Sequence, residues 1–260
     1  MRFTKAIVRP PAANFSEGLT TAVLGRPNFE IAVAQHDAYC RALQGCGLDL
    51  TRLNPDPDYP DSTFVEDAAV LTERTFVIAR PGAVSRRGEI TAIRATLANL
   101  PSSSVSLAAI DAPGTLDGGD VCEAGDQLFI GISERTNEAG AQQLADLLAP
   151  FGYRSTFVDI RQTKALLHLK SGLAYLGGNQ LVISKALSDR EEFVDYELVR
   201  VPAGEEYAAN CIRVNDVVMI AAGFADFEAR LRKLGYQTIA LNVSEFQKMD
   251  GGLSCLSLRF

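Results

Sequence analysis

The sequence lacks the features that mark several large classes of protein. Its 25 lysines and arginines are outnumbered by 32 aspartates and glutamates, and the formal net charge of −7 leaves no basic excess for binding nucleic acid. The longest apolar stretch, residues 217–224, is far shorter than the roughly 20 residues that span a bilayer. The first 15 residues lack the apolar core of a signal peptide. We therefore expect neither a nucleic-acid partner nor a membrane partner.

Two local motifs are also missing. No Gly-x-Gly-x-x-Gly turn is present, which argues against a dinucleotide-binding open sheet. No Cys-x-x-Cys spacing is present either, so the sequence gives no support for a structural zinc site. Without a leader peptide, five unpatterned cysteines predict a reduced, cytoplasmic protein rather than a disulfide framework. They are Cys40, Cys46, Cys122, Cys211 and Cys255.

A repeated unit of a hairpin, an amphipathic helix and a strand runs along the chain. The clearest copy predicts strands at 65–70 and 76–79, a helix that Ser85 caps and that ends near Leu100, and a strand at 104–110. Further copies cover residues 120–160, 173–201 and 211–243. In the copy at 173–201 the predicted helix is short and lies near 188–194. The chain ends supply a strand at 5–8, a helix at 28–43, a strand at 48–53 and a lone last strand at 253–260.

The count of repeats predicts a closed ring. Five helices require five hairpins, and the fifth hairpin is complete only if the last strand pairs with the first. Closure also removes exposed strand edges. An open α/β sheet is the alternative, and the missing nucleotide-binding turn disfavours it. We predict an α/β fold of five pseudo-symmetric ββαβ blades in one domain, residues 1–260.

Polar residues gather in the segments that lead into the hairpins, where a ring would bring them to its axis. These segments are 64–67, 116–120, 167–170, 208–211 and 250–255. Together they hold five carboxylates, His168 and Cys255, a combination typical of an active site. By contrast, Cys122, Cys211 and the other histidine, His36, lie in apolar patterns typical of core positions.

Seven motifs, spread over essentially the whole chain, resemble those of the dimethylarginine dimethylaminohydrolases of the guanidine-modifying pentein superfamily. Their order along the chain is part of the resemblance. The motifs are 61–67 (DSTFVED), 85–89 (SRRGE), 115–120 (TLDGGD), 135–137 (RTN), 167–170 (LHLK), 207–211 (YAANC) and 250–255 (DGGLSC). The resemblance implies a five-bladed α/β propeller, the pentein fold. It also implies hydrolysis of Nω-methylated L-arginine, such as asymmetric dimethylarginine or monomethylarginine, to L-citrulline and the methylamine, without a cofactor.

The chemistry explains why the family needs a cysteine. A guanidinium carbon is a poor electrophile, so its attacker must be a strong nucleophile, which favours the thiolate of Cys255. A guanidinium about 4 Å away favours that thiolate by roughly 4 kcal/mol at an effective dielectric near 20, so the substrate helps to ionise its own nucleophile. His168 is expected to protonate the departing amine and then activate water against the S-alkylthiouronium intermediate. Asp117 is expected to orient His168.

The resemblance also implies a set of substrate ligands. Glu66 and Asp67 are both expected at the guanidinium. Because adjacent side chains of a regular strand point to opposite faces, this contact requires a twisted backbone at these two residues. Asp61 is expected to bind the ammonium group, and Arg86 and Arg135 the carboxylate. Leu19 and Met249 supply backbone and apolar contacts, with residues 18–20 placed on a loop where a lid would lie.

Other functions stay open. An arginine deiminase would release ammonia, but those enzymes place an aspartate two residues after the histidine, where this chain has Lys170. An agmatine deiminase would not need Arg86 and Arg135, and non-catalytic ring proteins that bind ribosomes lack the cysteine–histidine pair. A protein that binds a metal through Cys255, His168 and Asp117 is a further alternative. We do not expect a required metal ion, but zinc bound to Cys255 and His168 would act as an inhibitor.

The remaining expectations are a small-molecule methylated arginine as the substrate and a protein that is either a monomer or a homodimer. Ala68 stands where some bacterial relatives have proline, which bears on the shape of the loop beside Glu66 and Asp67.

Overall fold

The computed structural model describes residues 2–100 and 105–260, which form five three-stranded sheets. In each sheet, an inner strand pairs antiparallel with a middle strand, which pairs parallel with an outer strand. Ordered from the inner strand outward, the sheets are β15 (Leu258–Arg259), β1 (Lys5–Val8), β2 (Asp49–Arg52); β3 (Ala69–Leu71), β4 (Thr75–Ile78), β5 (Ser106–Ala109); β6 (Val121–Ala124), β7 (Gln127–Ile132), β8 (Arg154–Asp159); β9 (Leu173–Gly177), β10 (Gln180–Ile183), β11 (Glu197–Arg200); and β12 (Ile212–Val214), β13 (Val217–Ala221), β14 (Gln237–Leu241).

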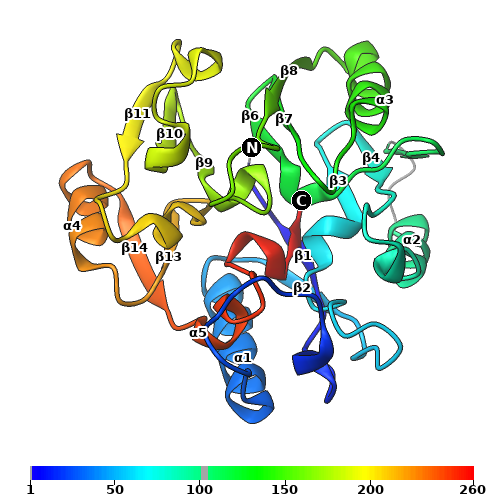
Figure 1. Cartoon of the computed structure of the whole chain (residues 1–260), viewed down its shortest axis with the longest axis horizontal. Helices are drawn as coiled ribbons and strands as arrows, with labels where there is room; N and C mark the ends of the chain where they lie inside the picture. Colours follow the sequence, from blue (N-terminus) through cyan, green and yellow to red (C-terminus); the bar gives the residue numbers. More distant parts are fainter. Residues whose placement is uncertain (1, 101–104) are drawn as a thin grey trace.

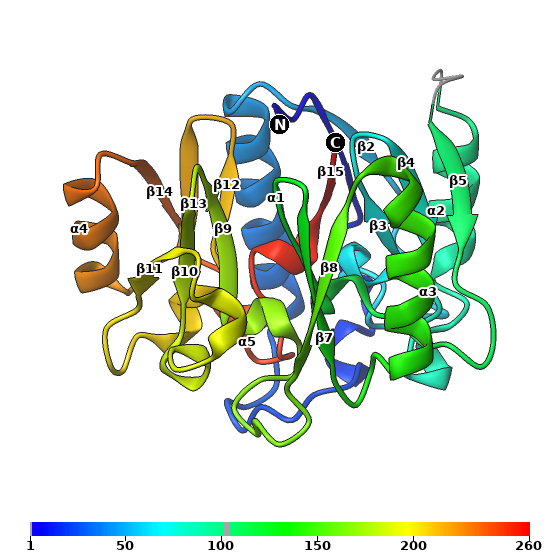
Figure 2. The same cartoon turned by 90° about the horizontal axis from the view of Figure 1, so that it is seen from above.

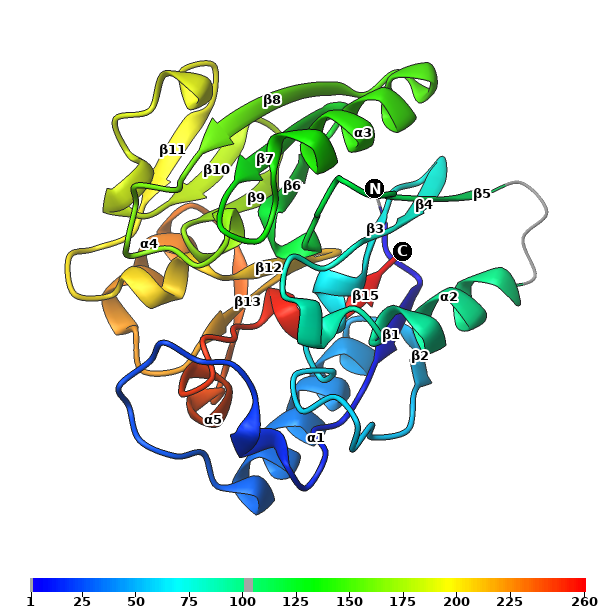
Figure 3. The same ribbon diagram turned by 45° about the vertical axis from the view of Figure 1, so that its right-hand side comes forward.

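Helices lie on the outer side of the ring of sheets (Figure 1). They are α1 (Phe29–Gly45), α2 (Ile90–Ala98), α3 (Glu138–Leu148), α4 (Ala225–Lys233) and the short α5 (Ser244–Gln247), which packs against α1. Figure 3 shows α2 and α3 flanking their own sheets from outside. Side chains of Asn28 and Asn137 cap α1 and α3 by accepting hydrogen bonds from the backbone three residues on, at 3.0 and 2.8 Å.

The last strand closes the ring, as predicted. β15 pairs antiparallel with β1, with Ala6 opposite Arg259 and Ile7 opposite Leu258. The Phe260 carbonyl accepts hydrogen bonds from the amides of Thr4 and Lys5 at 2.9 and 2.8 Å. In Figure 2 the red β15 runs beside the blue N-terminal segment. The two chain ends therefore share one sheet.

A buried core lies between each helix and its sheet. For example, Leu144 and Leu148 on α3 pack with Leu128 and Ile130 of β7, and all four are fully buried. Leu258 of the last strand joins the apolar cluster that contains strands β3 and β4, so ring closure is also a packing contact. No helix in the described residues is long and apolar enough to cross a membrane.

Several predicted element boundaries were wrong. The strand expected at 65–70 begins with the 3-10 turn η2 (Val65–Ala68), and the strand expected at 253–260 begins with the 3-10 turn η10 (Ser254–Leu256). Ser85 does not cap a helix: it lies inside η3 (Val84–Arg86), and α2 begins at Ile90. The short helix expected near 188–194 is replaced by η7 (Lys185–Leu187) and η8 (Glu191–Phe193). The strand expected from 104 is observed from Ser106, and Ser104 lies outside the described residues.

Each inner strand is preceded by a 3-10 turn, and this arrangement positions the polar residues at the axis. The turns are η2 (Val65–Ala68), η4 (Gly118–Asp120), η6 (Leu169–Ser171), η9 (Glu206–Ala209) and η10 (Ser254–Leu256). Neighbouring turns contact each other in the order η10, η2, η4, η6 and η9. Short apolar runs cannot distinguish such turns from strand starts, because periodicity needs more residues.

Candidate active site

The 3-10 turns at the axis carry the expected catalytic residues. Cys255 lies within η10, and Asp117 and His168 occupy the positions directly before η4 and η6. A small cavity is lined by Cys255, His168, Leu19, Asp61, Asp67, Arg86, Arg135 and Met249, together with Phe64, Leu167, Asp250 and Gly251. Eight of the ten predicted site residues therefore line one cavity, Asp117 lies directly behind His168, and Glu66 lies elsewhere.

The Cys255 thiol is buried and neutral at rest. Its side chain is 9% exposed, and the Gly252 amide donates to its Sγ atom at 3.4 Å. Burial, together with the nearby carboxylates of Glu66 and Asp67, raises the pKa of Cys255 to about 12, although the Gly252 hydrogen bond opposes them. A cation placed in the cavity would reverse this balance by stabilising the thiolate.

His168 is held in its charged form. Its Nε2 atom lies 3.2 Å from Oδ2 of Asp117, whose Oδ1 accepts the Gly82 amide at 2.9 Å. Burial lowers the pKa of His168, but the carboxylates of Asp67, Asp120 and Asp117 outweigh burial and raise the pKa to about 9. The ring is therefore a proton donor at neutral pH, in an orientation that Asp117 fixes.

Asp67 and Arg86 form a buried ion pair at the side of the cavity. Arg86 donates to Asp67 at 2.7 Å through Nη1 and to both Glu89 oxygens through Nε and Nη2 at 2.8 to 3.2 Å. The second oxygen of Asp67 accepts the Gly119 amide at 3.0 Å. Burial opposes the charged form of Asp67, but His168 and Arg86 lower its pKa to about 2, so this carboxylate remains ionised beside the thiol.

The two arginines that were expected to bind a carboxylate both line the cavity but differ in their contacts. The Arg86 guanidinium donates hydrogen bonds to Glu89, to Asp67 and to the backbone carbonyls of Asp61 and Phe64. Arg135 differs, because its buried Nη1 has no hydrogen-bond partner among the described residues. Buried donors are almost always satisfied in folded proteins. Arg135 therefore has a buried donor available for an anionic group in the cavity.

The loop predicted to act as a lid contributes Leu19 to the cavity wall. The Leu19 amide donates to both oxygens of Asp61, each at 3.1 Å, and Asp61 is 5% exposed. The Asp250 carboxylate accepts hydrogen bonds from the amide and the hydroxyl of Thr21 at 2.5 and 2.9 Å. The backbone of Asp250 is in the left-handed conformation, with φ of 58°. A Cβ atom at Gly18 would lie 2.3 Å from the Asp61 carboxylate, so the close approach of the loop needs glycine there.

In this closed form the cavity is small. Its volume is about 20 Å³, which suits a single water molecule rather than an amino acid. An arginine-sized ligand therefore requires the loop at 18–22 to move, and breaking the contacts of Leu19 with Asp61 and of Thr21 with Asp250 would release it.

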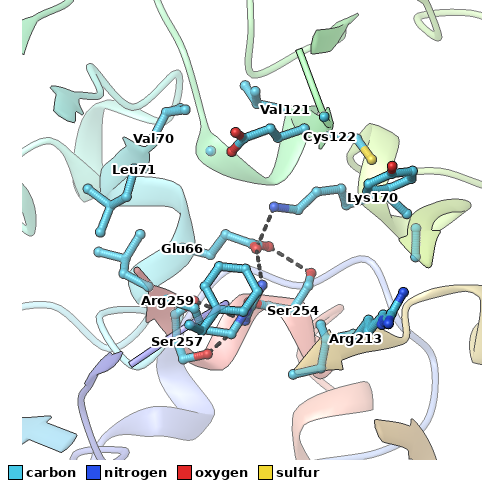
Figure 4. A pocket seen from close by; sticks show the side chains of 18 of the residues that line it. Glu66, Val70, Leu71, Val121, Cys122, Lys170, Arg213, Ser254, Ser257 and Arg259 are labelled. Carbon is cyan, nitrogen blue, oxygen red and sulfur yellow. Dashed lines mark hydrogen bonds and ion pairs between the residues drawn. The ribbon is translucent and has the colours of Figure 1, made fainter. Parts of the chain in front are cut away.

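Glu66 points away from this cavity. Because residues of a 3-10 turn are about 120° apart, adjacent side chains of η2 reach different neighbours. Glu66 binds Lys170 Nζ at 2.5 Å, accepts the Ser254 hydroxyl at 2.7 Å and lies 3.7 Å from Arg259 (Figure 4). These groups lie on the other side of the nucleophile turn and line a second cavity of about 580 Å³. The predicted contact of Glu66 with a guanidinium stays a prediction, and the Glu66 carboxylate is near enough to the Cys255 thiol to raise its pKa.

The group of potential metal ligands differs from the expected one. Among the described residues, the ligand atoms that gather within 4.8 Å of one another belong to Asp67, Asp117 and His168. Cys255 is not in this group, so the described residues do not assemble the cysteine–histidine–aspartate set that was considered as an alternative. Asp67 is already bound to Arg86 at 2.7 Å and Asp117 to His168 at 3.2 Å, and the three residues serve as an ion-pair network.

The residues assigned to the core lie where they were expected. Cys122 and Cys211 are 4% and 2% exposed, and His36 is 1% exposed in the middle of α1. Burial lowers the pKa of His36 to about 4, so this histidine is neutral and has no role at the axis.

Sequence reasoning missed three groups that build the site. Glu89 holds Arg86 from three residues on, a spacing at which side chains meet in a helical turn. A Cβ atom at Gly119 would lie 2.9 Å from the His168 ring, so this glycine allows the ring to approach. Asn210 donates hydrogen bonds to Lys170 in η6 and to Ser254 in η10, and so joins these two turns. Its position before a hairpin was the only signal for it in the sequence.

The comparisons with known proteins agree with this geometry. A family model described as arginine deiminase matches residues 56–209. An N(G),N(G)-dimethylarginine dimethylaminohydrolase of Pseudomonas aeruginosa is 43% identical over 99% of this chain and 100% of its own length. One from Streptomyces coelicolor is 36% identical over 98% of this chain and 96% of its own. A solved structure of the Pseudomonas protein, a cysteine-to-serine mutant complexed with citrulline, matches with a TM-score of 0.95 and covers 100% of both chains.

Proposed function

Because this chain belongs to the dimethylarginine dimethylaminohydrolase family, we propose that it hydrolyses Nω-methylated L-arginine to L-citrulline and methylamine or dimethylamine. The observation that carries the proposal is the cavity itself: the thiol of Cys255, the Asp117-bound imidazole of His168 and the ionised carboxylate of Asp67 meet there. These groups are a nucleophile, an acid and an anion for a cationic substrate.

The first step is attack by the Cys255 thiolate on the guanidinium carbon. At rest the pKa of Cys255 is about 12, because the thiol is buried and lies near the carboxylates of Glu66 and Asp67. A bound guanidinium supplies positive charge that opposes all of these effects. The substrate therefore ionises its own nucleophile, and the thiolate forms where it can react.

The second step transfers a proton to the leaving amine. His168, with a pKa near 9, carries that proton at neutral pH, and the amine leaves as the tetrahedral carbon collapses to the S-alkylthiouronium. The now neutral imidazole removes a proton from water, which attacks the same carbon. Collapse of this second intermediate releases citrulline and returns the sulfur and the ring to their starting states.

The remaining cavity residues hold the substrate. Asp67 would bind the guanidinium and Arg135 the α-carboxylate; the position of both on the cavity wall and the unpartnered Nη1 donor of Arg135 support these roles. Asp61 has both oxygens on the Leu19 amide in the closed form, so a substrate ammonium would share or replace that partner. Leu19 and Met249 complete the wall as the loop closes.

A product assay tests the function. Wild-type protein is incubated with asymmetric dimethylarginine and, in parallel, with arginine, and citrulline, dimethylamine and ammonia are measured. We expect citrulline and dimethylamine in equal amounts, with little ammonia from arginine. Ammonia from arginine with little turnover of the methylated substrate would assign the chain to the deiminases instead. No turnover of either substrate would favour a binding protein.

The titration of His168 predicts a dependence of stability on pH. Its pKa rises from 6.5 to about 9 on folding. A base with a raised pKa stabilises the fold fully below its unfolded pKa, and this contribution is lost as the pH rises through the folded value. Compared with His168→Asn, wild type should therefore lose about 3 kcal/mol of unfolding free energy between about pH 6 and about pH 9.5. Urea unfolding across this range measures it, and parallel curves for the two proteins would contradict the shift.

The setting of the enzyme is part of the same proposal. All five cysteines are free, which suits the reducing cytoplasm. Residues from four of the five axial turns or their flanks build the cavity and its support, so we treat residues 1–260 as one catalytic domain. The partner is the small-molecule substrate, and the protein acts as a monomer or homodimer without a cofactor.

A further inference from the structure

Asn210 links the turn that carries the nucleophile to the turn that carries the acid–base residue. It lies at the end of η9, is 6% exposed, and does not line the Cys255 cavity. Its Oδ1 accepts the Ser254 amide at 2.9 Å, directly before Cys255. Its Nδ2 donates to the Lys170 carbonyl at 3.0 Å, two residues after His168.

The side chain leaves little freedom at this junction. The Nδ2 group also donates to the Ser254 hydroxyl at 3.0 Å, so both amide hydrogens are used. A Cβ atom at Gly252 would lie 2.5 Å from the Asn210 side chain, so the nucleophile turn packs directly against it. Gly252 also donates to the Cys255 sulfur at 3.4 Å, and a shift of Asn210 would therefore reach the thiol.

These hydrogen bonds form a closed circuit behind the thiol. From Asn210 the circuit passes to the Ser254 hydroxyl, which donates to Glu66 at 2.7 Å, and from Glu66 to Lys170 Nζ at 2.5 Å. The Lys170 carbonyl returns it to Asn210. Figure 4 shows the Glu66, Ser254 and Lys170 part of the circuit, where these residues line the second cavity. Networks of this kind hold their members in one geometry.

We propose that Asn210 is a positioning residue that sets the placement of the Cys255 sulfur relative to the His168 ring. The inference rests on the proposed function, in which one carbon must be reached by both residues. Misplacement of reacting groups by about 1 Å can cost about 100-fold in rate. Asn210 does not line the Cys255 cavity, so its loss should act on kcat and leave substrate binding nearly intact.

The test compares Asn210→Asp with Asn179→Asp. The first variant keeps the shape and the acceptor for the Ser254 amide, but it loses both donations of Nδ2 and places a charge behind the thiol. The second makes the same chemical change at an exposed turn, where Nδ2 donates to the Asp195 carbonyl at 2.7 Å. We expect Asn210→Asp to lower kcat about 30- to 100-fold with KM within about threefold, and Asn179→Asp to match wild type.

A second readout separates positioning from a general structural role. Alkylation of Cys255 by iodoacetamide is followed against pH, with the other cysteines monitored by mass spectrometry. Since the added carboxylate opposes the thiolate, the pH profile of Cys255 in Asn210→Asp should move to higher pH while thermal unfolding remains cooperative. An unchanged kcat and an unchanged alkylation profile in Asn210→Asp would overturn the proposal.

A third variant keeps the test decisive if Asn210→Asp does not fold. Ser254→Ala removes the hydroxyl shared by Asn210 and Glu66 and retains the Ser254 amide contact. It should lower kcat by about tenfold with KM little changed, and a wild-type kcat in this variant would overturn the proposal. Failure of the proposed function is recognised separately, because wild type itself would then release no citrulline while the alkylation profiles could still be compared.

Discussion

Replacing Cys255 with serine is expected to lower kcat by about 10⁴-fold or more while methylated arginine still binds. The guanidinium carbon is a weak electrophile, and a serine hydroxyl is far harder to ionise than a thiol. The bound cation helps either group, but it cannot make up the difference for serine. The binding groups Asp61, Asp67 and Arg135 are separate from the sulfur, so the affinity for the substrate should change little.

The measurement has two parts. Citrulline formation gives the loss of turnover, and calorimetric titration with asymmetric dimethylarginine gives the binding. Cys46→Ser is the matched control, because Cys46 is only partly buried at the end of α1 and lies outside the cavity. Activity of Cys255→Ser within about tenfold of wild type would remove Cys255 from the role of nucleophile.

Deleting the last three residues, Leu258 to Phe260, should unfold or severely destabilise the protein although Cys255 remains in the chain. The deletion removes the whole of β15 and with it the antiparallel pairing to β1. It also removes the buried Leu258 side chain, the contact of Phe260 with Phe76 and the Arg259 interaction with Glu66. Loss of this burial and of several hydrogen bonds is expected to cost about 5 kcal/mol, as much as the total stability of many domains.

Thermal unfolding followed by circular dichroism measures the effect. Phe260→Ala is the control, because it removes one ring and keeps the backbone pairing of Phe260 with Lys5. This single substitution should lower stability by only about 1 to 3 kcal/mol, since Phe260 is partly exposed. Cooperative unfolding of the truncated protein at the wild-type temperature would contradict the closed ring.

The sequence was sufficient for the number of blades and for the closure. Hairpins, helices and strands recur with their own periodicities, and the unpaired strands at the two ends could be satisfied only by each other. The observed pairing of β1 with β15 confirms this. The secondary structure of short segments was predicted less well. The segment at 65–68 and the start of the last strand were expected to be extended but form 3-10 turns, because contacts with neighbouring turns outweigh local preference.

The chemistry at the axis followed from the sequence only in outline. Residue types and positions before the hairpins indicated a nucleophile, an acid–base group and carboxylates at the axis, and the resemblance to the family gave Cys255, His168 and Asp117 their roles. The same signals could not distinguish the two neighbours Glu66 and Asp67. The turn η2 sends Asp67 to Arg86 and His168 and sends Glu66 to Lys170 on the far side.

The sequence by itself determined the blade repeat and its closure, because these depend on periodicity, and it indicated the kind of chemistry through motifs shared with a known family. Only the tertiary structure decided which donor of Arg135 is free, which carboxylate faces the thiol and that Asn210 joins the two catalytic turns. These are contacts between residues far apart in the sequence. Their partners are fixed by how the five turns pack around the axis, and no local pattern in the sequence carries that information.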